Sequence, residues 1–217
     1  MWHARRVVAS LLLVLWWAAA SADEAWRLEK DEDGIQIYSR AVDGWDIREI
    51  RGLTTFHGRL SSLVAVIDDP ATGPALNKFV AESTVTQRDS DTRYRLYNLT
   101  RMPWPLSDRD VLNQREITQD TATHAVTIID NATDGLLPPK NGLVRIVRSR
   151  QLWSFTPKGN GDVQVELRWL SDPNGPIPST LINALSVSTP FHTIDRLRQI
   201  AQRPQYAQAR LAFIAEP

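Results

Sequence analysis

The residues that could do chemistry in this sequence are arginines set among apolar side chains. Arg109 and Asp110 are neighbours at the start of an expected strand, so they point to opposite faces and cannot pair with each other. Arg115 shares a strand face with Val111 and Ile117, which places it either inward among apolar groups or on a mixed outer face. An inward arginine needs a carboxylate or a polar ligand group, because a lone buried charge is costly. These residues therefore offer either a structural ion pair or recognition of a polar group.

Catalytic and metal-binding patterns are not found in the sequence. It contains no G-x-S-x-G nucleophile elbow, no P-loop and no G-x-G-x-x-G. Beyond His3 near the start of the chain, the histidines are His57, His124 and His192, which lie far apart with no H-E-x-x-H motif and no cysteine. We expect no catalytic residue, no metal site and no cofactor.

An apolar loop calls for a separate explanation. Met102, Trp104 and Leu106 are large apolar residues in a segment stiffened by Pro103 and Pro105. Loops lie on the surface, so we interpret this one as a gate or a membrane contact, since tryptophan suits the bilayer interface. The alternative is that the loop folds onto the C-terminal helix and closes the core.

The beginning of the chain has the pattern of a cleavable signal peptide. Arg5 and Arg6 precede an apolar run over residues 7–17, and small residues follow over 18–22. We expect cleavage before Asp23 and export to the periplasm, or possible secretion; the alternative is an uncleaved membrane anchor. The domain is then residues 23–217, whose 23 basic and 25 acidic side chains give a net charge near −2. This balance argues against a nucleic-acid partner.

The hydrophobic pattern predicts strands first and a long helix last. Strands are expected at 26–28, 35–38, 47–56, 83–88, 93–98, 110–118, 123–130, 144–155 and 163–169, the eighth with a bulge. Short helices are expected at 60–67 and 75–79. A helical stripe then runs from Leu181 and Leu185 through Ile194 to Ala201, and Pro190 should kink it or divide it in two.

This order of elements predicts the α+β class. The terminal helix would cover one face of a curved antiparallel sheet, and such a sheet can enclose a cavity. Trp153 and Trp169 are expected on the sheet surface, either in a solid core or in the wall of that cavity.

Four short motifs resemble those of the START domains, the steroidogenic-acute-regulatory-related lipid-transfer family. Residues 105–110 read P-L-S-D-R-D, similar to the family's P-L-S-x-R-D signature. Residues 26–38 resemble its opening hairpin, Val144-Arg145 its valine-arginine strand, and residues 172–178 its D-P-x-G-x-I-P turn. The motifs fall in the family's order across essentially the whole mature chain.

The resemblance implies a helix-grip fold: a curved antiparallel sheet around a long C-terminal helix, with a tunnel for a hydrophobic ligand. It implies that Met102, Trp104, Pro105 and Leu106 form the entrance together with that helix. Polar ligand contacts would come from Arg109, Arg115 and Arg145, and apolar ones from Trp153, Trp169, Leu181 and Leu185.

Some members of the family hold a buried acid–arginine pair in the cavity, and Arg115 falls near its basic position. Leu96 stands where the acid is expected, which puts a sterol-type cavity in doubt. Other possible partners are Glu49, Glu82, Glu116 and Glu166.

We therefore expect a monomeric protein, not an enzyme, that binds a lipid or other hydrophobic molecule for transfer or sensing in the cell envelope, with transient membrane contact. One alternative is a cavity enzyme of the cyclase or hydrolase kind found in the wider superfamily. Another is an envelope interaction or assembly factor that works through its outer surface.

Overall fold

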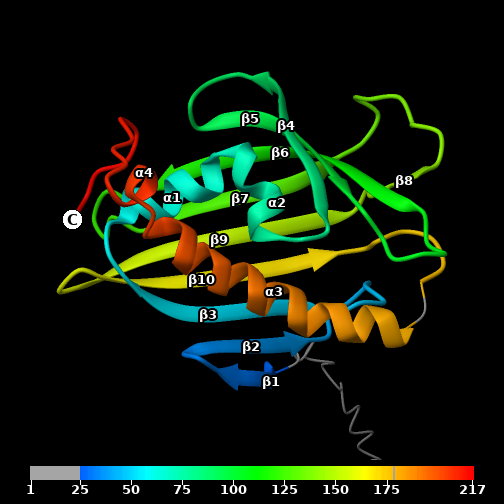
Figure 1. Cartoon of the computed structure of the whole chain (residues 1–217), viewed down its shortest axis with the longest axis horizontal. Helices are drawn as coiled ribbons and strands as arrows, with labels where there is room; N and C mark the ends of the chain where they lie inside the picture. Colours follow the sequence, from blue (N-terminus) through cyan, green and yellow to red (C-terminus); the bar gives the residue numbers. More distant parts are fainter. Residues whose placement is uncertain (1–24, 178) are drawn as a thin grey trace, which may run out of the picture.

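A single large antiparallel sheet and one long helix make up most of the protein. The computed structural model describes residues 25–177 and 179–217, and the predicted signal peptide lies outside them. Ten strands form the sheet (Figure 1): β1 (Arg27–Glu32), β2 (Ile35–Arg40), β3 (Glu49–His57), β4 (Val80–Arg88), β5 (Arg93–Thr100), β6 (Asp108–Gln119), β7 (Val126–Thr133), β8 (Leu143–Arg145), β9 (Ser149–Gly159) and β10 (Asp162–Ser171). The helical segments are α1 (Leu60–Asp68), η1 (Pro70–Thr72), α2 (Gly73–Leu76), α3 (Ser179–Ala201) and α4 (Pro204–Ala207). The predicted α+β class is confirmed.

The strands follow the order β1-β2-β3-β10-β9-β7-β6-β5-β4, so the sheet has two free edges. The β1–β2 hairpin forms where the sequence predicts it, because Asp33 and Gly34 both take the positive φ that a tight hairpin turn needs. Bulges interrupt the pairing of β1 with β2 and, twice, that of β4 with β5. Both edge strands are therefore irregular.

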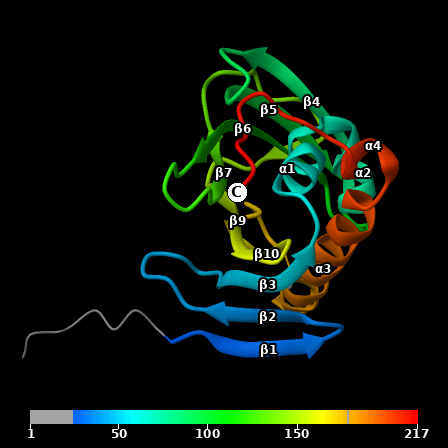
Figure 2. The same cartoon turned by 90° about the vertical axis from the view of Figure 1, so that its left-hand side faces the viewer.

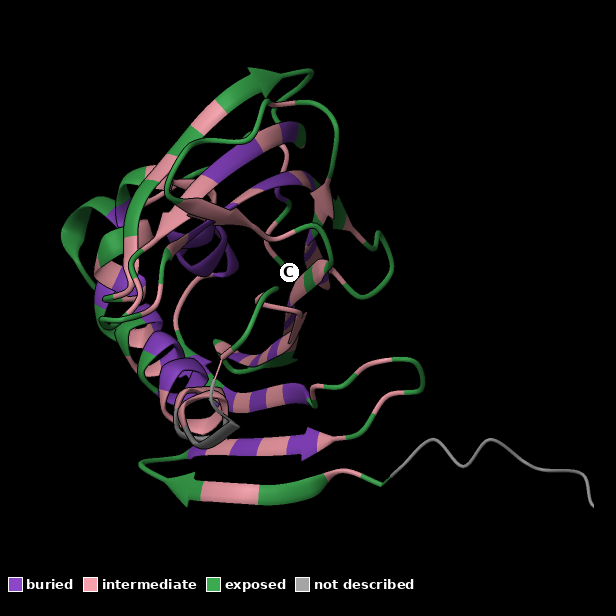
Figure 3. Ribbon diagram, turned by 90° about the vertical axis from the view of Figure 1, so that its right-hand side faces the viewer, coloured by how far each residue is buried: buried purple, intermediate pink, exposed green. Residues whose placement is uncertain are grey.

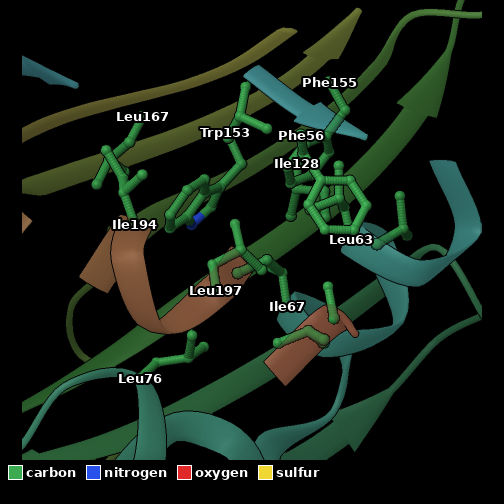
Figure 4. Close-up of a cluster of buried hydrophobic side chains, with 14 of the residues drawn as sticks. Phe56, Leu63, Ile67, Leu76, Ile128, Trp153, Phe155, Leu167, Ile194 and Leu197 are labelled. Atoms are coloured by element: carbon green, nitrogen blue, oxygen red, sulfur yellow. The ribbon is translucent and has the colours of Figure 1, made fainter. Parts of the chain in front are cut away.

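The sheet curls around α1, and α3 lies along its concave side (Figure 2). Side chains alternate between the two faces of each strand, which gives the banded burial pattern in Figure 3. The inward-facing strand residues pack on α1 and on the C-terminal half of α3 (Figure 4). The strands contribute Phe56, Ile128, Trp153, Phe155 and Leu167, and the helices contribute Leu63, Ile194 and Leu197. Gly52 allows the close approach of β3 to α3, since a Cβ there would lie 2.3 Å from the Ile194 side chain.

The segment 144–155 differs from the prediction. It is two strands rather than one bulged strand, with a break at residues 146–148. The short β8 pairs in parallel with the first three residues of β6, whereas β9 crosses to β7 and β10. This change of partner gives the phase shift in the hydrophobic pattern.

The helical segments also depart from the prediction in detail. The second short helix starts at Gly73 rather than at residue 75, with Pro74 in its first turn, where a missing N–H costs nothing. Helix α3 runs without interruption through Pro190, so the proline does not divide it. No helix within the described residues is long and apolar enough to cross a membrane.

The C-terminal tail returns to the start of α1. The Glu216 carboxylate accepts hydrogen bonds from the backbone N–H of Leu60 (3.1 Å) and Ser61 (2.9 Å), and from the guanidinium of Arg59 (3.3 Å). These N–H groups have no partner within the helix, so a carboxylate is well placed to accept from them.

Candidate functional site

A pocket of about 290 Å³ lies between the concave face of the sheet and the helical segments. Its volume is at the lower end of the roughly 300–1,000 Å³ of small-molecule sites. Its apolar wall comes from the sheet, from the α1–α2 region and from α3: Ile50, Ile67, Leu76, Phe79, Val80, Leu96, Val111, Trp153, Leu167, Trp169, Ile182 and Leu185. The sheet and the helical segments therefore enclose a largely apolar space.

The structure places most of the predicted apolar contacts at this pocket. Trp153 and Trp169 line it from β9 and β10, and Trp153 stacks on Phe155 with ring centroids 6.1 Å apart. Leu185 lines it from α3, whereas Leu181 does not and the neighbouring Ile182 takes that place. The N-terminal half of α3 supplies most of its pocket-lining residues, with Thr193 the one described contribution from beyond Pro190, because the C-terminal half is mainly packed in the core.

Arg115 points inward, and its partner is Asp130 on the adjacent strand β7. Nε and Nη2 of Arg115 lie 2.7 and 2.6 Å from the two Asp130 oxygens, and both residues are buried. Nη1 donates to the Ile67 carbonyl and to the Tyr94 hydroxyl (3.3 Å). Arg115 thus joins α1 to three strands.

The four candidate glutamates, Glu49, Glu82, Glu116 and Glu166, are not the partner. Sequence reasoning missed Asp130, although it follows the buried Ile128 at strand spacing and therefore belongs on the inner face. Burial on its own lowers the pKa of Arg115, but the adjacent Asp130 carboxylate raises it above the ordinary value. Burial raises the pKa of Tyr94 to about 12. At neutral pH Arg115 therefore keeps its charge and Tyr94 keeps its proton.

Arg109 also lines the pocket, and its partners are backbone carbonyls. Nη1 donates to the Ser107 carbonyl, Nε to that of Pro173 (3.3 Å) and Nη2 to that of Asn174 (3.2 Å). Burial lowers its pKa, partly offset by Asp108. Arg109 holds the loop before β6 against the turn that leads to α3.

Arg145 lies outside the pocket, on the outer face of the sheet. It forms a two-pronged ion pair with Asp110, at 2.7 and 2.9 Å, and the Asp110 carboxylate also accepts from the Tyr97 hydroxyl (3.3 Å). The hydrogen bonds from Arg145 to Asp110 raise the arginine's pKa. Asp110 and Arg109 face opposite sides of β6, as the strand alternation predicts. The expectation that Arg145 contacts a ligand in this pocket does not fit its position.

The pocket also has uncharged polar groups that sequence reasoning did not select. Asn98, Asn113 and Gln151 contribute amides, and Thr100, Ser149 and Ser171 contribute hydroxyls. They alternate with apolar residues along strands and read as ordinary strand residues in the sequence. Their shared position becomes visible only once the register of β5, β6, β9 and β10 is known.

The loop between β5 and β6 is exposed where the sequence predicts an apolar entrance. We call residues 102–106 the gate loop. Met102 lines the pocket, and its backbone N–H donates to the Asp108 carboxylate (2.9 Å). Trp104 is 93% exposed, so the loop does not fold down onto the terminal helix as the packing alternative requires. Leu106 is half-buried and Pro105 is exposed.

The pocket offers little for acid–base or metal chemistry. Its lining contains no histidine and no glutamate in the described part of the chain. Its two carboxylates are engaged, Asp130 with Arg115 and Asp69 with the Tyr206 hydroxyl at 2.7 Å. Among residues 25–177 and 179–217, no cluster of three histidine, cysteine or acidic side chains could hold a metal ion.

Comparisons with known proteins agree with this architecture. A sequence model of the START domain matches residues 9–206. A STAR-related lipid transfer protein from Xanthomonas axonopodis, known as a crystal structure of its fragment 25–204, is 32% identical with a TM-score of 0.74, covering 82% of this chain and 99% of that one. An uncharacterized protein of Pseudomonas aeruginosa is 29% identical over 180 residues, 83% of this chain and 88% of its own length. The phosphatidylcholine transfer protein of Rattus norvegicus is 25% identical over 162 residues, 73% of this chain and 75% of its own.

Proposed function

This chain belongs to the START-domain family, and from that premise we propose that it binds one lipid or similar hydrophobic molecule in the pocket beneath α3. The observation that carries the proposal is the pocket wall, in which large apolar side chains of the sheet face those of the N-terminal half of α3. Lipid-transfer relatives support the same class of ligand.

The binding energy comes mainly from burial of the ligand's apolar surface. Each buried methylene contributes about 0.8 kcal/mol relative to water. A donor bilayer gives the same methylene a similar gain, so selection among lipids depends on shape and on a few polar contacts. A pocket of about 290 Å³ is small for a long-chain lipid, so we expect the N-terminal half of α3 and the gate loop to move outward during loading.

We further propose that the gate loop touches a membrane during ligand exchange. Trp104 exposes an apolar body with one N–H donor, which suits the bilayer interface. Leu136 and Val147 are also exposed, on the loops either side of β8, and β8 pairs with the first residues of β6 that follow the gate loop. These loops lie at one end of the sheet (Figure 1), so a bilayer could contact them together.

The proposed place of action is the periplasm, reached by the cleavable leader at residues 1–22, with transfer or sensing of a lipid as the role there. A catalytic role is not part of the proposal, because the described pocket brings no free carboxylate or histidine to a ligand.

Native mass spectrometry of the protein expressed with its leader tests the proposal. We expect an N-terminus at Asp23 and a stoichiometric apolar ligand, which extraction would identify. A protein that emerges empty and also takes no lipid from liposomes would contradict lipid binding. An unprocessed N-terminus would contradict the export proposal alone.

A further inference from the structure

Three amide side chains that line the pocket, those of Asn98, Asn113 and Gln151, have no hydrogen-bond partner within the described residues, and the last two flank the buried Arg115–Asp130 pair. Asn113, on β6, is only 6% exposed and shares the inner face with Val111 and Arg115. Gln151, on β9, lies directly opposite Asp130 in the β7–β9 register. Neither side chain makes a hydrogen bond to any described group, and the polar atoms of both remain accessible from the pocket rather than enclosed by protein. Both are therefore available to a molecule that occupies the pocket.

The ion pair between these amides is closed to a ligand. Nε and Nη2 of Arg115 are held by Asp130, and Nη1 is held by the Ile67 carbonyl and the Tyr94 hydroxyl. An anionic ligand could recruit Arg115 only by leaving Asp130 buried without its counter-charge, which is strongly unfavourable. The Arg115–Asp130 pair therefore shapes the pocket wall but does not bind the ligand.

The sheet register brings the two amides to either side of this pair. Asn113 stands two residues before Arg115 on the same face, Arg115 is opposite Asp130, and Asp130 is opposite Gln151. Residues opposite each other on one face have Cβ atoms about 4.5–5.5 Å apart. Asn113 and Gln151 are two strands and two residues apart, so their Cβ atoms are about 11–12 Å from each other. The two amides can therefore contact different polar groups in the head of one ligand.

We propose that Asn113 and Gln151 form an uncharged subsite that binds hydroxyl, amide or carbonyl groups in the head of the hydrophobic ligand. Amides both donate and accept, so they suit these neutral groups, whereas they supply no charge to balance a phosphate. The protein accordingly selects a neutral amphiphile over a phosphate-bearing one with the same chain. This inference rests on the proposed lipid-binding function and adds the class of ligand.

The opposing possibility is an anion beside Arg109. Arg109 is buried at the pocket wall, and its guanidinium donates hydrogen bonds to backbone carbonyls rather than to a carboxylate. A phosphate-bearing ligand would be compensated there, close to the gate loop. The experiment must therefore separate a ligand read by Asn113 and Gln151 from one read by Arg109.

Monolauroylglycerol and lauroyl lysophosphatidic acid make a matched pair of probes, because they share one acyl chain and differ in a hydroxyl against a phosphate. We expect isothermal titration calorimetry below the micellar concentrations to show at least tenfold tighter binding of monolauroylglycerol. Asn113→Leu and Gln151→Leu should each weaken it by about 2- to 13-fold, the usual worth of one hydrogen bond. Lysophosphatidic acid should lose less affinity than monolauroylglycerol in these variants, because the amides supply no charge to balance its phosphate.

Asn131→Leu is the matched control, since Asn131 is exposed on the neighbouring strand β7 and its side chain has no partner in the described structure. Thermal melts establish that each variant folds; Asn113→Thr replaces Asn113→Leu if that variant does not fold, and Gln151→Met likewise replaces Gln151→Leu. Tighter binding of lysophosphatidic acid, lost in Arg109→Met, would overturn the neutral subsite and leave lipid binding intact. Unchanged monolauroylglycerol affinity in both amide variants would also overturn it. Failure of both probes and of liposome lipids to bind would instead contradict the proposed function.

Discussion

At the scale of single residues, the buried pair of Arg115 and Asp130 has the largest effect on stability that the structure lets us predict. Both residues are almost completely buried and joined by two short hydrogen bonds. Removing one partner leaves the other as an uncompensated buried charge. We therefore expect Asp130→Ala to lower the free energy of unfolding by about 3–5 kcal/mol, measured by urea denaturation.

The matched control for this prediction removes both charges. The double variant Arg115→Met with Asp130→Leu fills a similar volume without any buried charge. It should recover most of the lost stability, as replacement of buried ion pairs by apolar residues often does. A double variant no more stable than Asp130→Ala would show that the links from Arg115 to Ile67 and Tyr94 matter more than the charge pair.

Glu216 gives a pH-dependent prediction. Burial raises the pKa of its carboxyl, but hydrogen bonds from Ser61 and Leu60, with the charge of Arg59, hold it below the ordinary 4.5. A lowered pKa in the folded state means that the carboxylate stabilises the fold above about pH 4.5 and that this gain is lost as pH falls further. Glu216→Gln should therefore unfold more easily than the wild type at pH 7, by less than about 1 kcal/mol. The difference should vanish in acid, and a pH-independent difference would contradict the role of the charge.

The sequence pattern predicts which face of the sheet a side chain points to better than it predicts which residue that side chain contacts. Strand alternation correctly separates Asp110 from Arg109, and it allows an inward Arg115. It cannot identify Asp130 as the partner, because that depends on which strand lies beside β6 and in what register. The unpaired amides of Asn113 and Gln151 stay hidden for the same reason.

At the scale of elements, the gate loop should govern membrane association. Trp104→Ser removes the exposed indole and should weaken binding to liposomes several-fold in a flotation or sedimentation assay, with little change in stability, since Trp104 is 93% exposed. Leu28→Ser is the control, because Leu28 is a half-exposed apolar residue on the edge strand β1, away from the loop. Equal effects of the two substitutions would show that general hydrophobicity, not the loop, drives association.

Local sequence signals predict an element well where its bounds depend on neighbouring residues rather than on pairing with a distant strand. Strand β2 and helix α1 begin and end within two residues of their expected bounds because turn chemistry and helical spacing are local, whereas β1 continues to Glu32 rather than ending at Leu28. The break between β8 and β9 was not predictable in the same way, because β8 is set by parallel pairing with β6, more than thirty residues earlier in the chain.

At the scale of the whole molecule, α3 is divided by function although it is continuous. Its C-terminal half is fixed in the core by Phe191, Ile194 and Leu197, and its N-terminal half covers the pocket. Pro190 stands between the halves and lacks the N–H that would bond to the Ser186 carbonyl. This arrangement makes the proline a natural point of bending.

Hydrogen exchange measured by mass spectrometry tests this division. Amides of residues 182–189 should exchange faster than those of 191–200 in the ligand-free protein, because they rest on a pocket rather than on packed side chains. A bound ligand should slow exchange in the first segment only. Uniform protection along α3, with or without ligand, would contradict an opening N-terminal half.

The irregular edge strands have a consequence for the protein at high concentration. An open sheet presents unpaired N–H and C=O groups along both borders, which another copy could extend into a fibre. Here β1 carries five charged residues among its six, and bulges interrupt both β1 and the mostly exposed β4. A second copy would find neither border straight enough for a continuous ladder. Even at high concentration, copies of this protein should therefore not join edge to edge into fibres.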